Sequence, residues 1–207
     1  FMRELALTAL ASLVTILCLL LSTKFFASGL GAEAFGAYSL ARRVVSAMEP
    51  ISTFLMLIAL TRYVAFSRTD RKKHLYLIAG LLLVWLVNLI LILLVRIWNV
   101  AVANFLFGES GEYGDLLTAI TLLLFAYSHF ILLYSLYRAT GKMGLANAWQ
   151  VVVVGFVPLV ISIPSGLFAS VEVVILVCAL AFGAAAIPLF RLVMSHEMPS
   201  PSRLISG

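Results

Sequence analysis

Residues 29–63 read GLGAEAFGAYSLARRVVSAMEPISTFLMLIALTRY, a segment long and apolar enough to cross a membrane that nevertheless carries Arg42, Arg43 and Glu49 near its middle. A charged side chain at the centre of a bilayer costs from about 3 to about 17 kcal/mol, so such residues normally face a bundle interior or a water-filled cavity. We therefore expect these three side chains to line a cavity rather than to meet lipid.

The helical period divides this segment into two walls. At about 100° per residue, roughly one third of the circumference is polar and the opposite side is apolar. Because two arginines outnumber one glutamate, the polar wall is net positive and suits an anionic ligand, whose phosphate oxygens a guanidinium group binds in pairs. The polar wall holds Ser39, Arg42, Arg43, Ser46, Glu49 and Thr53, and the apolar wall holds Leu40, Val44, Met48, Ile51 and Leu55.

Pro50 directly follows Glu49 in this segment. A proline inside a helix removes a backbone donor and collides with the carbonyl group four residues earlier, here that of Ser46, so we expect a bend near the middle of the helix. In an alternative interpretation, Arg42 and Glu49 form an internal structural pair that closes the bundle. The site interpretation takes precedence, because an ionisable residue inside a membrane is by default a functional-site hypothesis.

The composition predicts an all-α membrane protein. Of 207 residues, 63% are hydrophobic and only 11% are charged, and the mean hydropathy is +1.13. A helix needs about 20 residues to cross the hydrocarbon, and six apolar runs of about that length use nearly the whole chain, which leaves no room for a soluble domain. We expect residues 1–207 to form a single bundle of six transmembrane helices, at about 5–23, 36–61, 75–97, 116–138, 147–168 and 173–194.

The first apolar run follows Arg3 and could instead be the core of a signal peptide. Its length, and a stripe of hydroxyl side chains at Thr8, Ser12, Thr15 and Ser22 that suits packing against a neighbouring helix, favour a membrane span.

The net charge of +5 does not indicate a nucleic-acid-binding protein, because the basic residues cluster beside the predicted spans. Membrane lipids, with their anionic headgroups, are the expected partners. The two cysteines, Cys18 and Cys178, lie inside apolar runs, so neither a disulfide framework nor a metal site is expected, and no motif indicates a cofactor.

The distribution of basic residues predicts the topology, because cytoplasmic loops are enriched in lysine and arginine. With both termini cytoplasmic, only Lys24 and Arg96 lie outside. An even number of spans requires both termini to lie on the same side of the membrane, and the distribution of basic residues places both on the cytoplasmic side. The inside set is Arg3, Arg62, Arg68, Arg71, Lys72, Lys73, Arg138, Lys142, Arg191 and Arg203.

His129, inside the fourth predicted span, is a candidate proton relay, since histidine titrates near neutral pH. A hydrogen-bonded packing histidine is the alternative, and we favour it. The hydroxyl residues of the same span have no acid and histidine beside them in a catalytic arrangement, so we do not expect an enzyme.

Two segments resemble a known family. LGAEAFGAYSLARR (residues 30–43), followed by a helix ending in LTRYVA (residues 60–65), resembles the first loop and second span of polysaccharide-biosynthesis and O-antigen flippases in the multidrug/oligosaccharidyl-lipid/polysaccharide exporter superfamily. YRATGKMGLANAWQ (residues 137–150) resembles that family's link between spans four and five. The likeness covers most of the chain in order and spacing.

The resemblance implies a two-lobed transporter with six helices in each lobe. Such a protein moves polyprenyl-pyrophosphate-linked oligosaccharide from the inner to the outer leaflet of a bacterial or archaeal cytoplasmic membrane by alternating access. This chain would supply the N-terminal lobe, and its partner would be a second six-helix lobe, missing here by truncation, or another copy. The family lines its cavity with basic residues from early spans. The candidate cargo-binding residues are Arg42, Arg43 and Lys24, together with Ser46 and Glu49.

Three alternatives stay open. A drug/cation antiporter of the same superfamily would need intramembrane carboxylates, and only Glu49 is well placed. A membrane-embedded transferase acting on lipid-linked sugars would need an acidic cluster, and Glu109, Glu112 and Asp115 are the only dense group. The third alternative is a lobe that does not transport and only scaffolds a partner.

Overall fold

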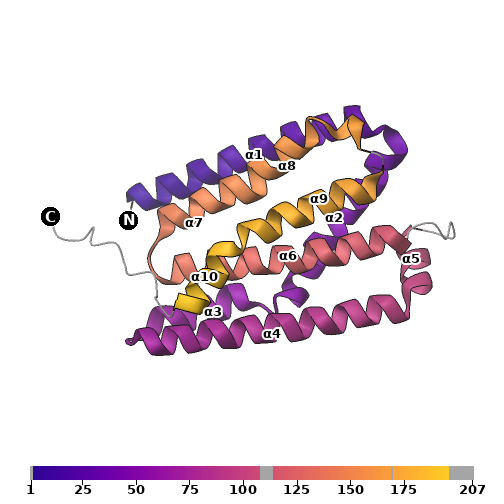
Figure 1. The fold of residues 1–207 in the computed structure, drawn as a ribbon. Helices are drawn as coiled ribbons and strands as arrows, with labels where there is room; N and C mark the ends of the chain where they lie inside the picture. Colours follow the sequence, from indigo (N-terminus) through magenta and orange to yellow (C-terminus); the bar gives the residue numbers. More distant parts are fainter. Residues whose placement is uncertain (1, 108–113, 169, 196–207) are drawn as a thin grey trace.

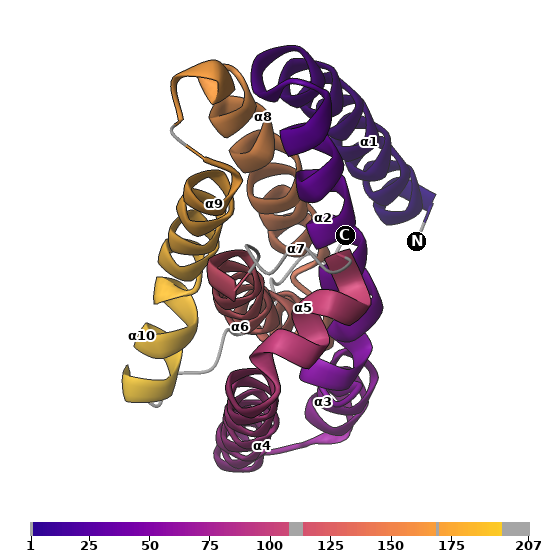
Figure 2. The same cartoon turned by 90° about the vertical axis from the view of Figure 1, so that its right-hand side faces the viewer.

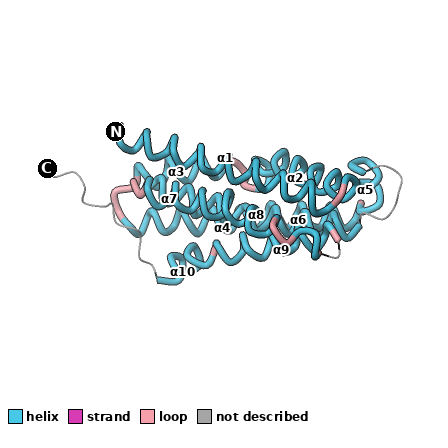
Figure 3. Tube along the Cα trace, turned by 90° about the horizontal axis from the view of Figure 1, so that it is seen from above, coloured by secondary structure: helices cyan, strands magenta, loops and turns pink. Residues whose placement is uncertain are grey.

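A computed structural model describes residues 2–107, 114–168 and 170–195, and the regular elements in those ranges are all helices (Figures 1 and 3). The elements, in chain order, are α1 (Met2–Leu30), α2 (Ala32–Ser52), α3 (Met56–Phe66), α4 (Asp70–Ile97), α5 (Asn99–Phe107), α6 (Gly114–Ala139), α7 (Met143–Trp149), the π-helix η1 (Gln150–Phe156), α8 (Val157–Ser162), the 3₁₀ turn η2 (Ser165–Leu167), α9 (Val171–Ala185) and α10 (Ile187–Ser195).

Five stretches in the described residues are long and apolar enough to cross a membrane, and the bent pair of α2 and α3 adds a sixth if it is counted as one span. The all-α class and the multi-pass membrane character are therefore confirmed. Each of the six predicted apolar runs corresponds to one of these stretches. The five are Glu4–Leu30, Asp70–Ile97, Gly114–Ala139, Met143–Ser162 and Val171–Ser195.

Helix α6 forms the centre of the bundle, with α2, α3, α4 and α9 packed around it (Figure 2). Its 18-residue apolar window is 67% buried, against 22% for α4, which lies at the edge. On the far side of the bundle, α1 runs along α7, η1 and α8 (Figure 1).

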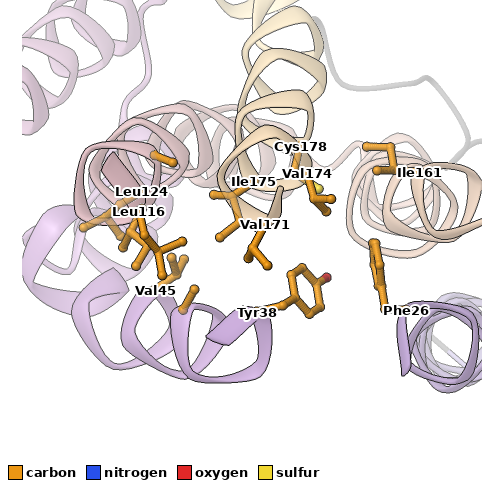
Figure 4. Packing of buried hydrophobic residues seen from close by; sticks show 13 residues of the cluster. Phe26, Tyr38, Val45, Leu116, Leu124, Ile161, Val171, Val174, Ile175 and Cys178 are labelled. Carbon is orange, nitrogen blue, oxygen red and sulfur yellow. The ribbon is translucent and has the colours of Figure 1, made fainter. Parts of the chain in front are cut away.

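Two separate clusters of buried apolar residues hold the two halves of the bent span. We call them the α2 core and the α3 core. The α2 core consists of Phe26, Tyr38, Ala41, Val45, Leu116, Ala119, Ile120, Leu124, Ile161, Val171, Val174, Ile175 and Cys178 (Figure 4). The α3 core consists of Leu60, Val64, Leu77, Leu81, Val84, Leu132, Leu133, Leu136, Tyr137, Ala146 and Leu189.

The connection between the first two spans is much shorter than predicted. Helix α1 continues to Leu30 and α2 begins at Ala32, so Lys24 lies on a helix rather than in a loop. Gly31 alone makes the turn, with φ 78°, a left-handed conformation that glycine adopts without steric cost. The glycines on either side of this turn, Gly29 and Gly36, are helical.

Three other boundaries differ from the prediction. The stretch after the third span, predicted as a loop, contains the short helix α5. The predicted span 147–168 begins earlier, at Met143, and ends earlier, at Ser162. Its outer end lies at Pro164, which follows α8 after Ile163 and leads into the single turn of η2. The last span is interrupted at Ala186, between α9 and α10.

The two ends of the bundle differ in charge. The start of α1, the α3–α4 and α6–α7 connections and the end of α10 lie at one end, and the α1–α2 and α8–α9 connections lie at the other (Figure 1). Apart from Lys24 and Arg96, the basic residues outside α2 belong to elements that meet at the first end. Arg203 lies outside the described residues. The basic residues of the first end are Arg62, Arg68, Arg71, Lys72, Lys73, Arg138, Lys142 and Arg191.

Candidate functional site

The expected bend lies a few residues after Pro50. Helix α2 continues through Pro50 to Ser52, and the chain turns by 41° between α2 and α3. At the turn, Phe54 and Leu55 have φ of 48° and 55°. The left-handed conformation costs an L-residue about 1–2 kcal/mol, and neither residue is a glycine, so the break needs compensating interactions.

A buried group of polar side chains supplies such interactions. We call Ser52, Asn88 and Ser128 the polar cluster; it joins α2, α4 and α6. The amide of Asn88 donates to the Ser52 carbonyl oxygen at 3.1 Å and to that of Val84 at 2.8 Å. In an unbroken helix the backbone N–H of Met56 would donate to the Ser52 carbonyl, but at the break it donates to the Thr53 carbonyl. Without Asn88, the Ser52 carbonyl would therefore lack a hydrogen-bond partner in place of the helical one.

A cavity of about 180 Å³ lies on the other side of α2, between that helix and α1, α6, η1, α8 and α9. Three of the predicted site residues, Arg42, Ser46 and Glu49, line it together. Figure 4 shows Tyr38, Val45, Ile175 and Cys178 where α2 faces α9. The remaining lining residues are Leu19, Tyr38, Val45, Leu123, Tyr127, Val154, Pro158, Ile175, Cys178 and Phe182.

Arg42 is the cation of this cavity. Its guanidinium carbon lies 6.0 Å from the centre of the Tyr38 ring, and the side chain is half-buried. Glu49 lines the same cavity but forms no ion pair with Arg42. The alternative of a structural Arg42–Glu49 pair therefore does not describe this structure, and no carboxylate among the described residues forms an ion pair with Arg42.

Arg43 points elsewhere. It is exposed and does not line the cavity, but it lines an open groove of about 580 Å³ that Arg42 and Ser46 also border. The helical period grouped the two arginines. In the structure both line the groove, but only Arg42 also lines the cavity. The groove is lined by Thr23, Phe35, Tyr38, Ser39, Arg42, Arg43, Ser46 and Ala47.

Lys24 and His129 are not part of the cavity. Lys24 is exposed on α1 and lines neither the cavity nor the groove. His129 is buried; its Nδ1 lies 2.8 Å from the Phe125 carbonyl oxygen, and the Trp85 indole N–H donates to its Nε2 at 2.8 Å. Both ring nitrogens are thus occupied by packing contacts, which favours the packing alternative over a proton relay.

Three further cavity residues escaped the sequence analysis: Tyr38, Tyr127 and Cys178. Tyr38 lies one helical turn before Arg42, so the i, i+4 spacing could have placed it beside the arginine. Tyr127 and Cys178 come from α6 and α9, and nothing in their local sequence relates them to α2.

The lining of the cavity suits non-covalent binding. It combines one guanidinium group, one carboxyl group, two phenol rings, the hydroxyl of Ser46 and the thiol of Cys178 with apolar walls, a composition typical of ligand sites. Within the described residues, no group of three or more His, Cys, Asp or Glu side chains could hold a metal ion. Of the acidic group named above for a transferase, Glu109 and Glu112 lie outside the described residues.

Comparison with known proteins identifies no relative: no family model, curated protein or solved structure matches the chain.

Proposed function

We propose that this chain forms one lobe of an exporter that moves polyprenyl-pyrophosphate-linked oligosaccharide from the inner to the outer leaflet of the cytoplasmic membrane. The observation that carries the proposal is Arg42, a half-buried cation on an internal cavity of a membrane-spanning bundle, with no ion-pair partner in the part of the chain that the structure describes. A pyrophosphate group cannot cross hydrocarbon unaided, and a fixed cation inside the membrane lowers that barrier without making or breaking a bond.

The cavity has room for only part of the proposed cargo. A volume of about 180 Å³ corresponds to about six water molecules. That is enough for a pyrophosphate group and too small for an oligosaccharide. The larger open groove adjoins the cavity at Tyr38, Arg42 and Ser46, so the sugar would occupy the groove while the phosphates reach Arg42. A second six-helix lobe, or another copy of this chain, would close the groove from the other side.

The orientation follows from the charge of the two ends. The end that gathers the α3–α4 and α6–α7 connections would face the cytoplasm, as the positive-inside rule requires. Arg42 lies about 15 Å along α2 from its first residue, at the opposite end, which is about half of the hydrocarbon thickness of about 30 Å, so the cation would sit near the middle of the membrane. The cargo would therefore reach it after leaving the inner leaflet.

The test is a reconstitution of the full protein in vesicles loaded with a fluorescent polyprenyl-pyrophosphate-linked oligosaccharide. An impermeant glycosidase outside the vesicles reports the arrival of the sugar in the facing leaflet. The wild type should expose the cargo to the glycosidase. A variant with Arg42→Ala and Arg43→Ala should insert normally but expose the cargo only at the rate seen in vesicles without protein. Wild-type rates in the double variant would refute the assignment of the site.

A drug/cation antiporter is the second candidate, because Glu49 lines the same cavity. In that case Glu49→Gln should abolish the exchange of an organic cation against a proton or sodium gradient, and the gradient-driven uptake would be measured in the same vesicles. Lipid-linked cargo moving normally in Glu49→Gln, with no cation exchange in the wild type, would exclude this candidate.

A further inference from the structure

We propose that residues Thr53–Leu55 are a hinge between two separately packed halves of the lobe, and that the polar cluster holds this hinge in its bent state. The proposal does not depend on which cargo the protein carries. It rests on the backbone of the break, on the division of the cores and on the hydrogen bonds of Asn88.

The break separates two halves of the span that pack in different clusters. Helix α2 contributes Tyr38, Ala41 and Val45 to the α2 core, and α3 contributes Leu60 and Val64 to the α3 core. These two clusters share no buried residue, although α6 contributes to both. A change of dihedral angles between Ser52 and Met56 would therefore change the angle between α2 and α3 along this common helix, as a hinge within a span does.

The residues of the break are free to change conformation. Phe54 and Leu55 are each 59% exposed, so their rotation disrupts little packing. An apolar groove of about 410 Å³ lies beside them, between the break and α4, and leaves space on that side. Their left-handed dihedral angles are unfavourable for residues with a Cβ atom, so the chain itself favours leaving the bent state.

The polar cluster opposes that tendency. Asn88 is 2% exposed, and its amide nitrogen serves the Ser52 carbonyl, which the break deprives of its helical partner. The hydroxyl of Ser52 donates back to the Asn88 carbonyl oxygen at 2.9 Å. In a straight helix the Ser52 carbonyl would accept from Met56 instead, and this pair of bonds would be lost. The cluster therefore selects the bent state.

The hinge is connected to the cavity. The carbonyl oxygen of Glu49, whose side chain lines the cavity, accepts from both the backbone N–H and the hydroxyl of Thr53 at 2.9 Å. Thr53 is the first residue of the hinge, so the hinge begins one helical turn after Glu49 and directly adjoins the end of the cavity. A bundle that opens its cavity to alternate sides needs an element with two conformations. This hinge has a bent and a straight conformation, and the contacts of the polar cluster stabilise the bent one.

The experiment measures the distance between spin labels on cysteines introduced at two exposed positions, Gly36 on α2 and Phe66 on α3, in the full protein with both native cysteines replaced by serine. At 1.5 Å per residue, a straight helix would separate these positions by about 45 Å and the 41° bend by about 42 Å. The wild type should give mainly the shorter distance. Asn88→Leu, which removes the hydrogen bonds at similar volume, should shift the distribution about 3 Å longer.

Leu55→Gly provides the opposite perturbation, because glycine adopts the left-handed conformation freely. It should keep the shorter distance and narrow the distribution, and the combination of Leu55→Gly with Asn88→Leu should return the distance toward that of the wild type. This combination also covers the case in which Asn88→Leu alone folds poorly. Leu86→Ala, on the exposed face of α4, is the matched control and should change nothing.

Two results would overturn the proposal. One is an unchanged distribution in Asn88→Leu when the protein is inserted normally, or a distance in the combination with Leu55→Gly that stays as long as in Asn88→Leu alone. The other is a longer distance in Leu55→Gly. Failure of cargo transport with the expected distances would contradict the proposed function and leave the hinge in place.

Discussion

The sharpest prediction separates Arg42 from Arg43. The two residues are adjacent in the sequence and carry the same charge, but only Arg42 lines the cavity, while Arg43 is exposed on the open groove. Arg42→Ala and Arg43→Ala should therefore differ strongly in their effect on transport, although both remove one positive charge from the same turn of α2.

The magnitude follows from the environment of each side chain. A charge-assisted hydrogen bond in a partly desolvated site is worth about 1.5–3 kcal/mol, which corresponds to a factor of about 10 to 150 in cargo affinity at about 1.4 kcal/mol per tenfold change. An exposed ion pair is worth at most about 1 kcal/mol, a factor of about five. Arg42→Lys should lie between the wild type and Arg42→Ala, because lysine keeps the charge but not the paired donors.

The assay is the vesicle experiment described above, run at cargo concentrations well below saturation so that the rate reflects affinity. Arg96→Ala is the control, since Arg96 is another exposed arginine and lines neither the cavity nor the groove. Equal loss in Arg42→Ala and Arg43→Ala, or a larger loss in Arg43→Ala, would refute the division of the two arginines between cavity and groove.

Three further predictions concern packing, the histidine and the topology. A Cβ atom at Gly29 would collide with the η2 turn, so Gly29→Ala should destabilise the protein by about 1–3 kcal/mol in thermal unfolding, whereas Gly183→Ala, with no atom within 4 Å of its Cβ, should not. His129→Leu should cost about 1–3 kcal/mol because it leaves the Trp85 indole N–H without its acceptor, and the pH profile of transport should keep its shape; a flattened profile would revive the proton relay. Cysteine at Glu33 should react with an impermeant thiol reagent added outside cells, and cysteine at Thr69 only after permeabilisation; the reverse pattern would invert the topology.

The spans could be predicted from the sequence because their lengths are set by the bilayer. Six apolar runs gave six candidate spans, and the structure contains the corresponding helices. The boundaries were less predictable, since one residue, Gly31, suffices for a turn that the surrounding glycines suggested would be longer. Pro50 likewise indicated a bend, but the helix tolerates it and breaks at Phe54 and Leu55, two apolar residues that carry no turn signal.

Of the candidate site, the sequence predicted the residues that share one face of α2. The period brought Arg42, Ser46 and Glu49 onto a common wall, and they line a common cavity. It could not separate Arg43, because a position on the circumference does not tell which neighbour packs there. Contacts between helices could not be predicted from the sequence for the same reason. Asn88 and Ser128 are isolated polar residues in their own spans, and only the fold brings them to Ser52.

The most direct test of the central claim asks whether a pyrophosphate group meets Arg42 inside the cavity. Ser46→Cys places a thiol on the cavity wall one turn from Arg42, in a protein whose Cys18 and Cys178 are replaced by serine. Polyprenyl-pyrophosphate-linked oligosaccharide, added at about ten times its dissociation constant, should slow the reaction of this thiol with a small anionic reagent about tenfold, because only unoccupied sites react. A polyprenol without phosphate should not slow it, and Arg42→Ala should abolish the protection. Equal protection by the uncharged polyprenol, or full protection in Arg42→Ala, would contradict the account.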